Sequence, residues 1–183
     1  MGHKDDSSDI YVIDLNSKEV TNITNDIFSD SSPSWSSNGE VIYFTSDRGN
    51  SSQTKNMFEI DFSQTDIFQY SFASNKIIQL TDTEYNENYP VASSEGNLFY
   101  TSDYNGITNI FKHNLDTNES FPITNVVTGV QQIDLDGSNN LVFSGFKKRG
   151  WDLYLMNNLE MASKKEVKPT KFFVSKGGNN DLE

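Results

Sequence analysis

The chain has 183 residues, of which 26 are acidic and 14 basic, so its formal net charge is −12 at pH 7. This length suits one domain with a single hydrophobic core, and the negative charge argues against nucleic-acid binding, which needs a clustered positive field. The absence of cysteine excludes disulfide scaffolds and thiolate metal sites. No apolar run approaches the roughly 20 residues that cross a bilayer, so we expect no membrane insertion of this segment.

A two-part unit recurs along the chain. Its first part reads DIYVIDLNSKEVTNITN at 9–25, DIFQYSFASNKIIQLTD at 66–82 and NIFKHNLDTNESFPITN at 109–125, and its start returns as DLYLMNN at 152–158. Its second part reads PSWSSNGEVIYFTSDRG at 33–49, PVASSEGNLFYTSDYNG at 90–106 and QIDLDGSNNLVFSGFKKRG at 132–150. Four strand-sized runs in a period near 43 residues are typical of a propeller blade.

The sequence therefore predicts an all-β fold, a partial β-propeller of about three to four four-stranded antiparallel blades. The propeller spans 9–158, and its predicted parts in chain order are part of blade 1 at 9–24, blade 2 at 33–81 with an insertion at 50–65, blade 3 at 89–124, blade 4 at 131–158, and a C-terminal strand or tail at 159–183. Blade 1 supplies only its last two strands. Blade 4 supplies its first three, with Glu166–Val174 as a possible fourth.

Alternation in the third strand-sized run of a blade assigns side chains to its two faces. Ile10, Val12 and Asp14 point one way, while Tyr11, Ile13 and Leu15 point the other way. Both faces are apolar, as expected where each sheet packs against its neighbours. Because closed propellers have four to eight blades, the terminal faces of about three and a half blades need a cover. We expect either self-association through those faces or capping by residues 158–173.

Turn residues stand where the blades need them. Asn38-Gly39, Glu95-Gly96 and Asp136-Gly137 separate the first two strands of successive blades, where a tight hairpin needs a positive φ. Asp47 and Asp103 follow Thr-Ser at the end of the second strand. We expect their carboxylates to accept hydrogen bonds from the backbone of the next turn.

These motifs resemble the TolB-like propeller repeat family. The matching residues are Pro33, Trp35, Ser36 and Gly39 for the first motif, Thr45 to Gly49 for the second, Asp9-Ile10-Tyr11 with Asp14-Leu15 for the third, and Ile23-Thr24, Leu80-Thr81 and Ile123-Thr124 for the closing pair. Residues 123–156 also resemble a stretch of large bacterial envelope proteins in which such repeats accompany other modules. The resemblance implies a periplasmic or cell-envelope location and partners among proteins or sibling domains of a parent chain.

Catalytic residues are scarce. The only histidines are His3 and His113, and the chain contains neither a Gly-x-Ser-x-Gly elbow nor the His-Glu-x-x-His of the metallopeptidases that accompany such repeats. The run Asp134–Asn140 loosely resembles a calcium loop, but it lacks the distal glutamate and aligns with the hairpins of the other blades. We therefore expect no enzyme activity, no cofactor and no metal.

Two segments are candidates for binding a partner. Within the insertion, the apolar side chains are Met57, Phe58, Ile60 and Phe62, which suit an extra edge strand or a docking element. Near residue 150 the chain carries its densest basic run beside an aromatic residue: Lys147, Lys148, Arg149 and Trp151. This run is either an anchor for an acidic partner or a solvated loop.

The sequence thus favours a noncatalytic protein-interaction scaffold. An alternative is a substrate-gating propeller of an exported peptidase or hydrolase whose catalytic domain lies elsewhere in the parent protein. A third possibility is binding of carbohydrate or peptide by aromatic side chains at the propeller mouth.

Overall fold

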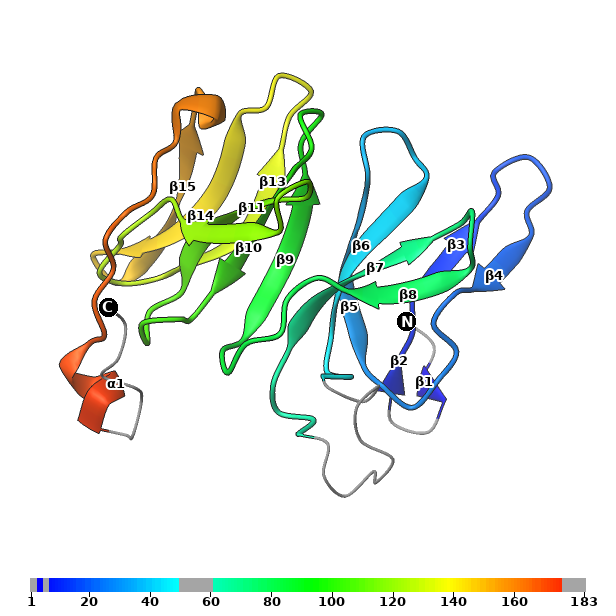
Figure 1. Ribbon diagram of the computed structural model, residues 1–183, viewed down its shortest axis with the longest axis horizontal. Helices are drawn as coiled ribbons and strands as arrows, with labels where there is room; N and C mark the ends of the chain where they lie inside the picture. The colour runs from blue at the N-terminus through cyan, green and yellow to red at the C-terminus, as the bar shows by residue number, and fades with distance from the viewer. Residues whose placement is uncertain (1–2, 5–6, 50–60, 176–183) are drawn as a thin grey trace.

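The computed structural model describes residues 3–4, 7–49 and 61–175, and in it the blades stand as separate sheets in chain order (Figure 1). The prediction of a partial, all-β propeller is confirmed. Blade 1 has two strands, β3 (Tyr11–Ile13) and β4 (Val20–Asn22), and a short pair precedes it, β1 (His3–Lys4) and β2 (Ser7–Ser8). Blades 2 and 3 are four-stranded antiparallel sheets, and blade 4 has three strands. Their strands are β5 (Asp30–Trp35), β6 (Val41–Ser46), β7 (Asp66–Ser71) and β8 (Lys76–Gln79), then β9 (Glu87–Ala92), β10 (Asn97–Ser102), β11 (Asn109–Asn114) and β12 (Glu119–Pro122), and finally β13 (Val130–Leu135), β14 (Leu141–Lys147) and β15 (Gly150–Met156).

The first strands of blades 2, 3 and 4 carry the same irregularity. The register of β5 against β6, of β9 against β10 and of β13 against β14 shifts once, at a β-bulge. At each bulge one residue has a positive φ, namely Ser32, Tyr89 or Gln132. Residues of β5, β9 and β13 line one cavity of about 360 Å³. Because a bulge sharpens the bend and twist of a strand, its repetition gives the strands on this cavity a common shape.

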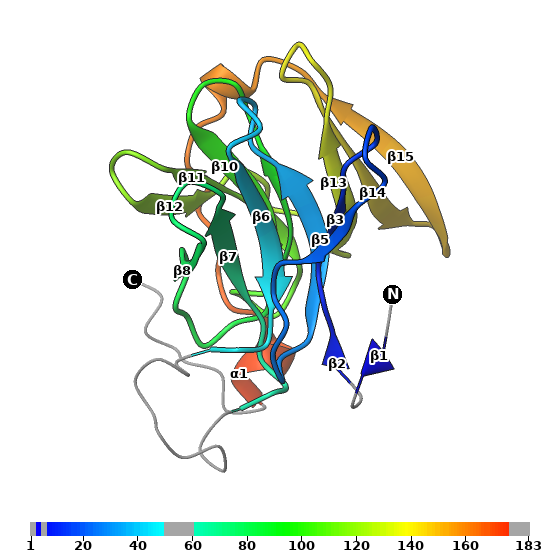
Figure 2. The same ribbon diagram turned by 90° about the vertical axis from the view of Figure 1, so that its right-hand side faces the viewer.

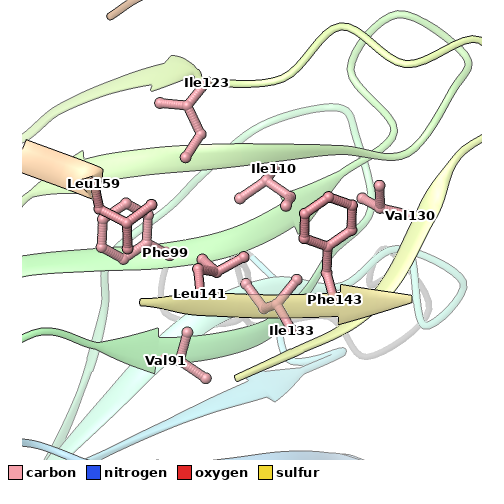
Figure 3. Close-up of a cluster of buried hydrophobic side chains, with 9 residues drawn as sticks. All are labelled: Val91, Phe99, Ile110, Ile123, Val130, Ile133, Leu141, Phe143 and Leu159. Atoms are coloured by element: carbon pink, nitrogen blue, oxygen red, sulfur yellow. The ribbon is translucent and has the colours of Figure 1, made fainter. Parts of the chain in front are cut away.

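A hydrophobic cluster fills each interface between neighbouring blades. Between blades 3 and 4 it contains the side chains drawn in Figure 3, with Phe99 and Ile110 of blade 3 against Leu141 and Phe143 of blade 4. Between blades 2 and 3, Tyr43 and Ile67 meet Leu98, Tyr100 and Phe111. Ile10 of blade 1 packs against Ile42, Phe44 and Phe68 of blade 2. The interfaces therefore place the core between the sheets, as the face-to-face stacking of blades requires.

The turns follow the sequence in two blades and differ in the third. Gly39 and Gly96 have φ of 73° and 75°, as the hairpin requires. In blade 4 the positive φ belongs to Asn139 and not to Gly137, because Asn139, whose N donates to Asp136 O, has the turn position of Gly39, whose N donates to Ser36 O. Asp47 and Asp103 also differ from the prediction. Each accepts a hydrogen bond from the backbone before the first strand of its own blade, Asp47 from Ser29 N at 2.7 Å and Asp103 from Asn86 N at 2.8 Å.

The C-terminal segment corrects two expectations. The predicted fourth strand at 166–174 is absent from the described residues, which hold instead a 3-10 turn, η2 (Leu159–Met161), and a five-residue helix, α1 (Lys171–Ser175). Lys165 N donates to Pro122 O at 2.8 Å and Thr170 N donates to Asn105 O at 3.0 Å, so the segment runs along blade 3. Its helix α1 lies at the same end of the molecule as β1 and β2 (Figure 2). Capping of blade 4 by this segment was thus a wrong prediction. No helix in the described residues is long and apolar enough to span a membrane.

Candidate functional site

The outward face of blade 4 is apolar and exposed. Register places Leu153 of β15 opposite Ser144 of β14, in the position that Ile67 and Ile110 occupy in blades 2 and 3. The isoleucines are fully buried by the next blade, with 0% exposure, whereas 81% of Leu153 is exposed. Trp151 and Leu155 flank Leu153 on the same face and are also exposed. This set, Trp151, Leu153 and Leu155 with Phe146 of β14, is called the blade 4 end face below.

The basic hairpin borders this face. Lys147 pairs with Gly150, so Lys148 and Arg149 form a two-residue loop, and both have positive φ, 47° and 69°. Such a loop normally carries Asn-Gly, because other residues are strained there by about 1 kcal/mol or more each. Trp151 packs edge-on against the Phe146 ring at 5.4 Å. The loop therefore holds two cations in a strained conformation beside an exposed aromatic pair, a combination that occurs at functional sites.

A cavity of about 430 Å³ opens beside the hairpin. Its lining is mostly apolar, from the segment that connects blades 3 and 4 and from β14, and Lys147 and Lys148 stand at its edge. The Tyr154 ring packs closely on Gly145, because a Cβ at Gly145 would lie 2.9 Å from that ring. Phe146 belongs to the end face and also lines the cavity, so the two are continuous.

The other end of the row is also bare. Tyr11 and Ile13 point away from blade 2 and are about half exposed, and Val20, paired with Ile13, is exposed with them. Their counterparts in blades 2 and 3 include Phe68 and Phe111, which are buried against the preceding blade. Because β3 and β15 lie at opposite ends of the row (Figure 1), the two bare faces do not cover each other.

The predicted docking residues are only partly located. Met57, Phe58 and Ile60 lie outside the described residues. Phe62 is exposed and stacks on Phe28 at 6.0 Å, in the segments that connect blades 1 and 2 and the second and third strands of blade 2. The structure therefore does not bring Phe62 to the hairpin of blade 4, although it does gather Lys147, Lys148, Arg149 and Trp151 around one loop.

The two residues considered for chemistry have structural partners. His113 is buried, and its Nδ1 lies 2.8 Å from Ser120 Oγ. Burial lowers its pKa, which favours the neutral ring. Asp136 accepts hydrogen bonds at 2.8 Å from the side chain of Asn140 and from the backbone N of Asn140 and Ser138, and these bonds lower its pKa. The run Asp134–Asn140 is therefore a hairpin turn closed by its own aspartate.

A buried ion network between blades 1 and 2 was not recognised in the sequence. Arg48 donates to both oxygens of Asp30 at 2.7 and 2.8 Å and to Asp26 at 2.9 Å. One carboxylate oxygen from each of Asp9, Asp26 and Asp30 lies within 4.8 Å of the other two. These negative charges repel one another, and the positive charge of Arg48 offsets that repulsion. The sequence did hold a sign of this network, because the motif Thr-Ser-Asp-Arg-Gly has its arginine in blade 2 and lacks it in blade 3.

Known proteins share the fold but little sequence. A scan against protein-family models gave no match, and a search of curated proteins gave none. Among solved structures, a protein described as TolB from Agrobacterium tumefaciens is 16% identical with a TM-score of 0.70, and the match covers 88% of this chain and 56% of that one. TolB from Acinetobacter baumannii is 14% identical with a TM-score of 0.65, over 85% of this chain and 36% of that one. A puromycin-hydrolyzing peptidase of Mycobacterium tuberculosis is 12% identical with a TM-score of 0.52, over 71% and 20%.

This chain spans about half or less of the length of these structures. At such low identity the likeness concerns the arrangement of strands and blades. The repeated motifs, the four sheets in chain order and the two TolB structures agree, and the chain therefore has a TolB-like β-propeller fold.

Proposed function

We propose that this chain is a noncatalytic protein-interaction scaffold, and that its first partner is a second copy of itself, bound through the blade 4 end face. The observation that carries the proposal is the 81% exposure of Leu153, at a position that is fully buried in blades 2 and 3. Large apolar residues gathered on one exposed face mark an interaction site more often than isolated ones do. The buried, neutral His113 supports the noncatalytic part of the proposal.

A second copy suits the face because each chain carries both halves of a blade interface. The blade 4 end face lacks a following blade, and Tyr11 and Ile13 of blade 1 lack a preceding one. Contact between the two is head-to-tail, and such contacts close into a ring when the rotation permits. Two copies of this row total seven to eight blades, within the four to eight of closed propellers.

The basic hairpin adds a charge argument. The partner copy has a net charge of −12, and Lys147, Lys148 and Arg149 form a compact cationic spot at the edge of the end face. Opposite charges at an interface rim accelerate association and set its orientation. An envelope location belongs to the same proposal, since it rests on the resemblance to TolB-like repeats.

Sedimentation velocity of the chain between about 1 and 100 µM tests the proposal. We expect a concentration-dependent dimer that Leu153→Asp abolishes, because a buried unpaired carboxylate in the interface costs several kcal/mol. Ile78→Asp is the control, since Ile78 is an exposed apolar residue of β8 in blade 2, away from the end face, and it should leave the dimer intact. A monomer at 100 µM, or a dimer unaffected by Leu153→Asp, contradicts the proposal.

A substrate-gating propeller beside a hydrolase is the second candidate. Its support is the likeness to the puromycin-hydrolyzing peptidase over 71% of this chain. The sequence of the full-length protein tests this candidate, because a catalytic motif must then lie outside these residues.

A further inference from the structure

The three junctions between blades differ in charge at one repeated place. At the blade 1–2 junction the repeat holds Asp9, Asp26 and Asp30 with Arg48. At the blade 2–3 junction the same repeat positions hold Asp66, Thr83, Glu87 and Tyr104. At the blade 3–4 junction they hold Asn109, Val126, Val130 and Lys147. Of the three junctions, only the one between blades 2 and 3 has two acidic residues at these positions and no basic residue.

Glu87 and Asp66 are deeply buried at this junction. Glu87 begins β9 and is 2% exposed, and Asp66 begins β7 and is 1% exposed. Thr83 bridges them, with its hydroxyl 3.3 Å from Glu87 Oε1 and its backbone N 3.4 Å from Asp66 Oδ1. No ion pair to either carboxyl forms within residues 3–4, 7–49 and 61–175. The pair is therefore surrounded by protein but not neutralised by a side chain of the described part.

Three of the hydrogen bonds that reach the pair are long. The two from Thr83, and the one from Gln79 to Asp66 Oδ2 at 3.3 Å, all exceed the usual 2.7–3.2 Å. The Thr81 side chain also hydrogen-bonds Glu87. By contrast, Asp30 receives two bonds of 2.7 and 2.8 Å from Arg48 at the equivalent place. Glu87 Oε2 is buried and has no hydrogen-bond partner.

Burial, with Asp66 and Asp103 adding to it, raises the pKa of Glu87 to about 8, because two acidic groups share this buried place. Glu87 Oε2 has no partner in the described residues, and an unsatisfied buried polar atom is costly. A cation beside Oε2 removes both the unpaired atom and the like-charge repulsion.

We propose that Glu87 and Asp66 form the core of a cation site at the blade 2–3 junction, which takes a hard divalent ion, Ca²⁺ in preference to Mg²⁺. The oxygen atoms available as ligands are those of the two carboxylates and the Thr83 hydroxyl, and the Thr65 hydroxyl beside Asp66 in sequence is also buried without a partner. Oxygen ligands select Ca²⁺ and Mg²⁺ over softer metals. Ca²⁺ accepts irregular geometry, whereas Mg²⁺ demands near-ideal octahedral ligands.

The ion neutralises acidic side chains at this junction, as Arg48 does at the previous one. It binds residues of the first strand of blade 3 and the third strand of blade 2, so that Ca²⁺ stabilises the packing of these two blades. The site lies in blades 2 and 3 and not at the blade 4 end face, so it goes beyond the proposed scaffold role. The Asp134–Asn140 turn has no part in it.

Thermal unfolding of the full chain, first dialysed against EDTA, tests the site with CaCl₂ and MgCl₂ as probes. At about a hundred times its Kd, Ca²⁺ should raise the Tm of a chain of this size by roughly 5 to 10 °C, and Mg²⁺ should raise it less. Glu87→Gln should abolish the rise. Asp134→Asn, which removes an exposed carboxylate from the turn, is the matched control and should keep it.

A second variant keeps the test decisive if Glu87→Gln does not fold. Tyr104→Arg places a guanidinium at the position that Arg48 has in blade 2, and it should make the Tm insensitive to Ca²⁺. Calorimetric titration of the wild-type chain should give one Ca²⁺ per chain. The proposal is overturned if neither ion raises the wild-type Tm, or if Glu87→Gln or Tyr104→Arg keeps the full Ca²⁺ response.

Discussion

At the scale of single residues, Arg48 shows how one side chain joins blade 2 to the segment that connects it with blade 1. Its guanidinium contacts Asp26 and Asp30 and lies 5.4–5.5 Å from the ring centres of Phe28, Phe44 and Phe68. Burial raises the pKa of Asp30, and the attraction of Arg48 opposes that rise. The arginine therefore allows an acidic residue to remain buried between sheets that are otherwise held by apolar packing.

Replacing Arg48 tests this role. Arg48→Met leaves Asp30 buried without its partner, and we expect the free energy of unfolding to fall by about 3 to 5 kcal/mol. Urea denaturation measures the change. The control is the double variant Arg48→Met with Asp30→Asn, which removes the stranded charge and should recover part of the loss. Equal stability of the single and double variants would show that the charge at Asp30 does not matter.

His113 predicts a dependence of stability on pH. Because burial lowers its folded-state pKa, the unfolded chain binds a proton to this ring more readily than the folded chain does. The contribution of His113 is therefore complete above the unfolded pKa of about 6.5 and is lost as the pH falls from there towards the folded pKa. We expect the wild type to lose stability relative to His113→Gln between pH 7.5 and 5. A constant difference in unfolding free energy across that range contradicts the prediction.

At the scale of elements, the third strand of each blade has one sequence pattern but different surroundings. Ile10, Ile67, Ile110 and Leu153 occupy the same place in the repeat. The first three lie against the next blade, and Leu153 faces outward from blade 4. The strand pattern therefore specifies which way a side chain points, while the neighbouring blade determines whether it is buried.

Matched truncations separate these two effects. Ile67→Ala should lower the free energy of unfolding by about 2 to 5 kcal/mol, because it removes packed methyl groups from a filled interface. Leu153→Ala should change it by no more than about 0.5 kcal/mol at protein concentrations low enough for the monomer. Urea titrations of both variants at about 1 µM give the comparison. A large cost for Leu153→Ala in the monomer means that the end face is covered within the chain itself.

At the scale of the whole molecule, the row of blades has two unlike ends. Within residues 3–4, 7–49 and 61–175 no blade follows blade 4 and none precedes blade 1, and both end blades expose apolar side chains. The C-terminal segment, a candidate cover, binds the blade 3 edge through Pro122 and Asn105 instead. The open ends and the acidic net charge of −12 act in opposite directions, since apolar faces favour association and like net charges oppose it.

The sequence by itself determined the fold class, the order of the blades and the alternation of faces. These features arise from local periodicity and turn chemistry, which repeat with each unit. Gly39 and Gly96 mark the hairpins, and the alternation from Ile10 to Ile13 shows which side chains share a face. The hairpin with Trp151 was also visible, because its charges are contiguous in the chain.

Only the tertiary structure decided what covers each face and which charges meet. Arg48 reaches Asp30 and Asp26 across 18 and 22 residues, and Glu87 lies beside Thr83 and Asp66 because β7 and β9 belong to adjacent sheets. The C-terminal segment carried no repeat that would place it, and it took the edge of blade 3, where unpaired backbone groups accept its hydrogen bonds. Contacts between separate sheets depend on how whole blades stack, and a periodic pattern within one blade holds no information about its neighbour.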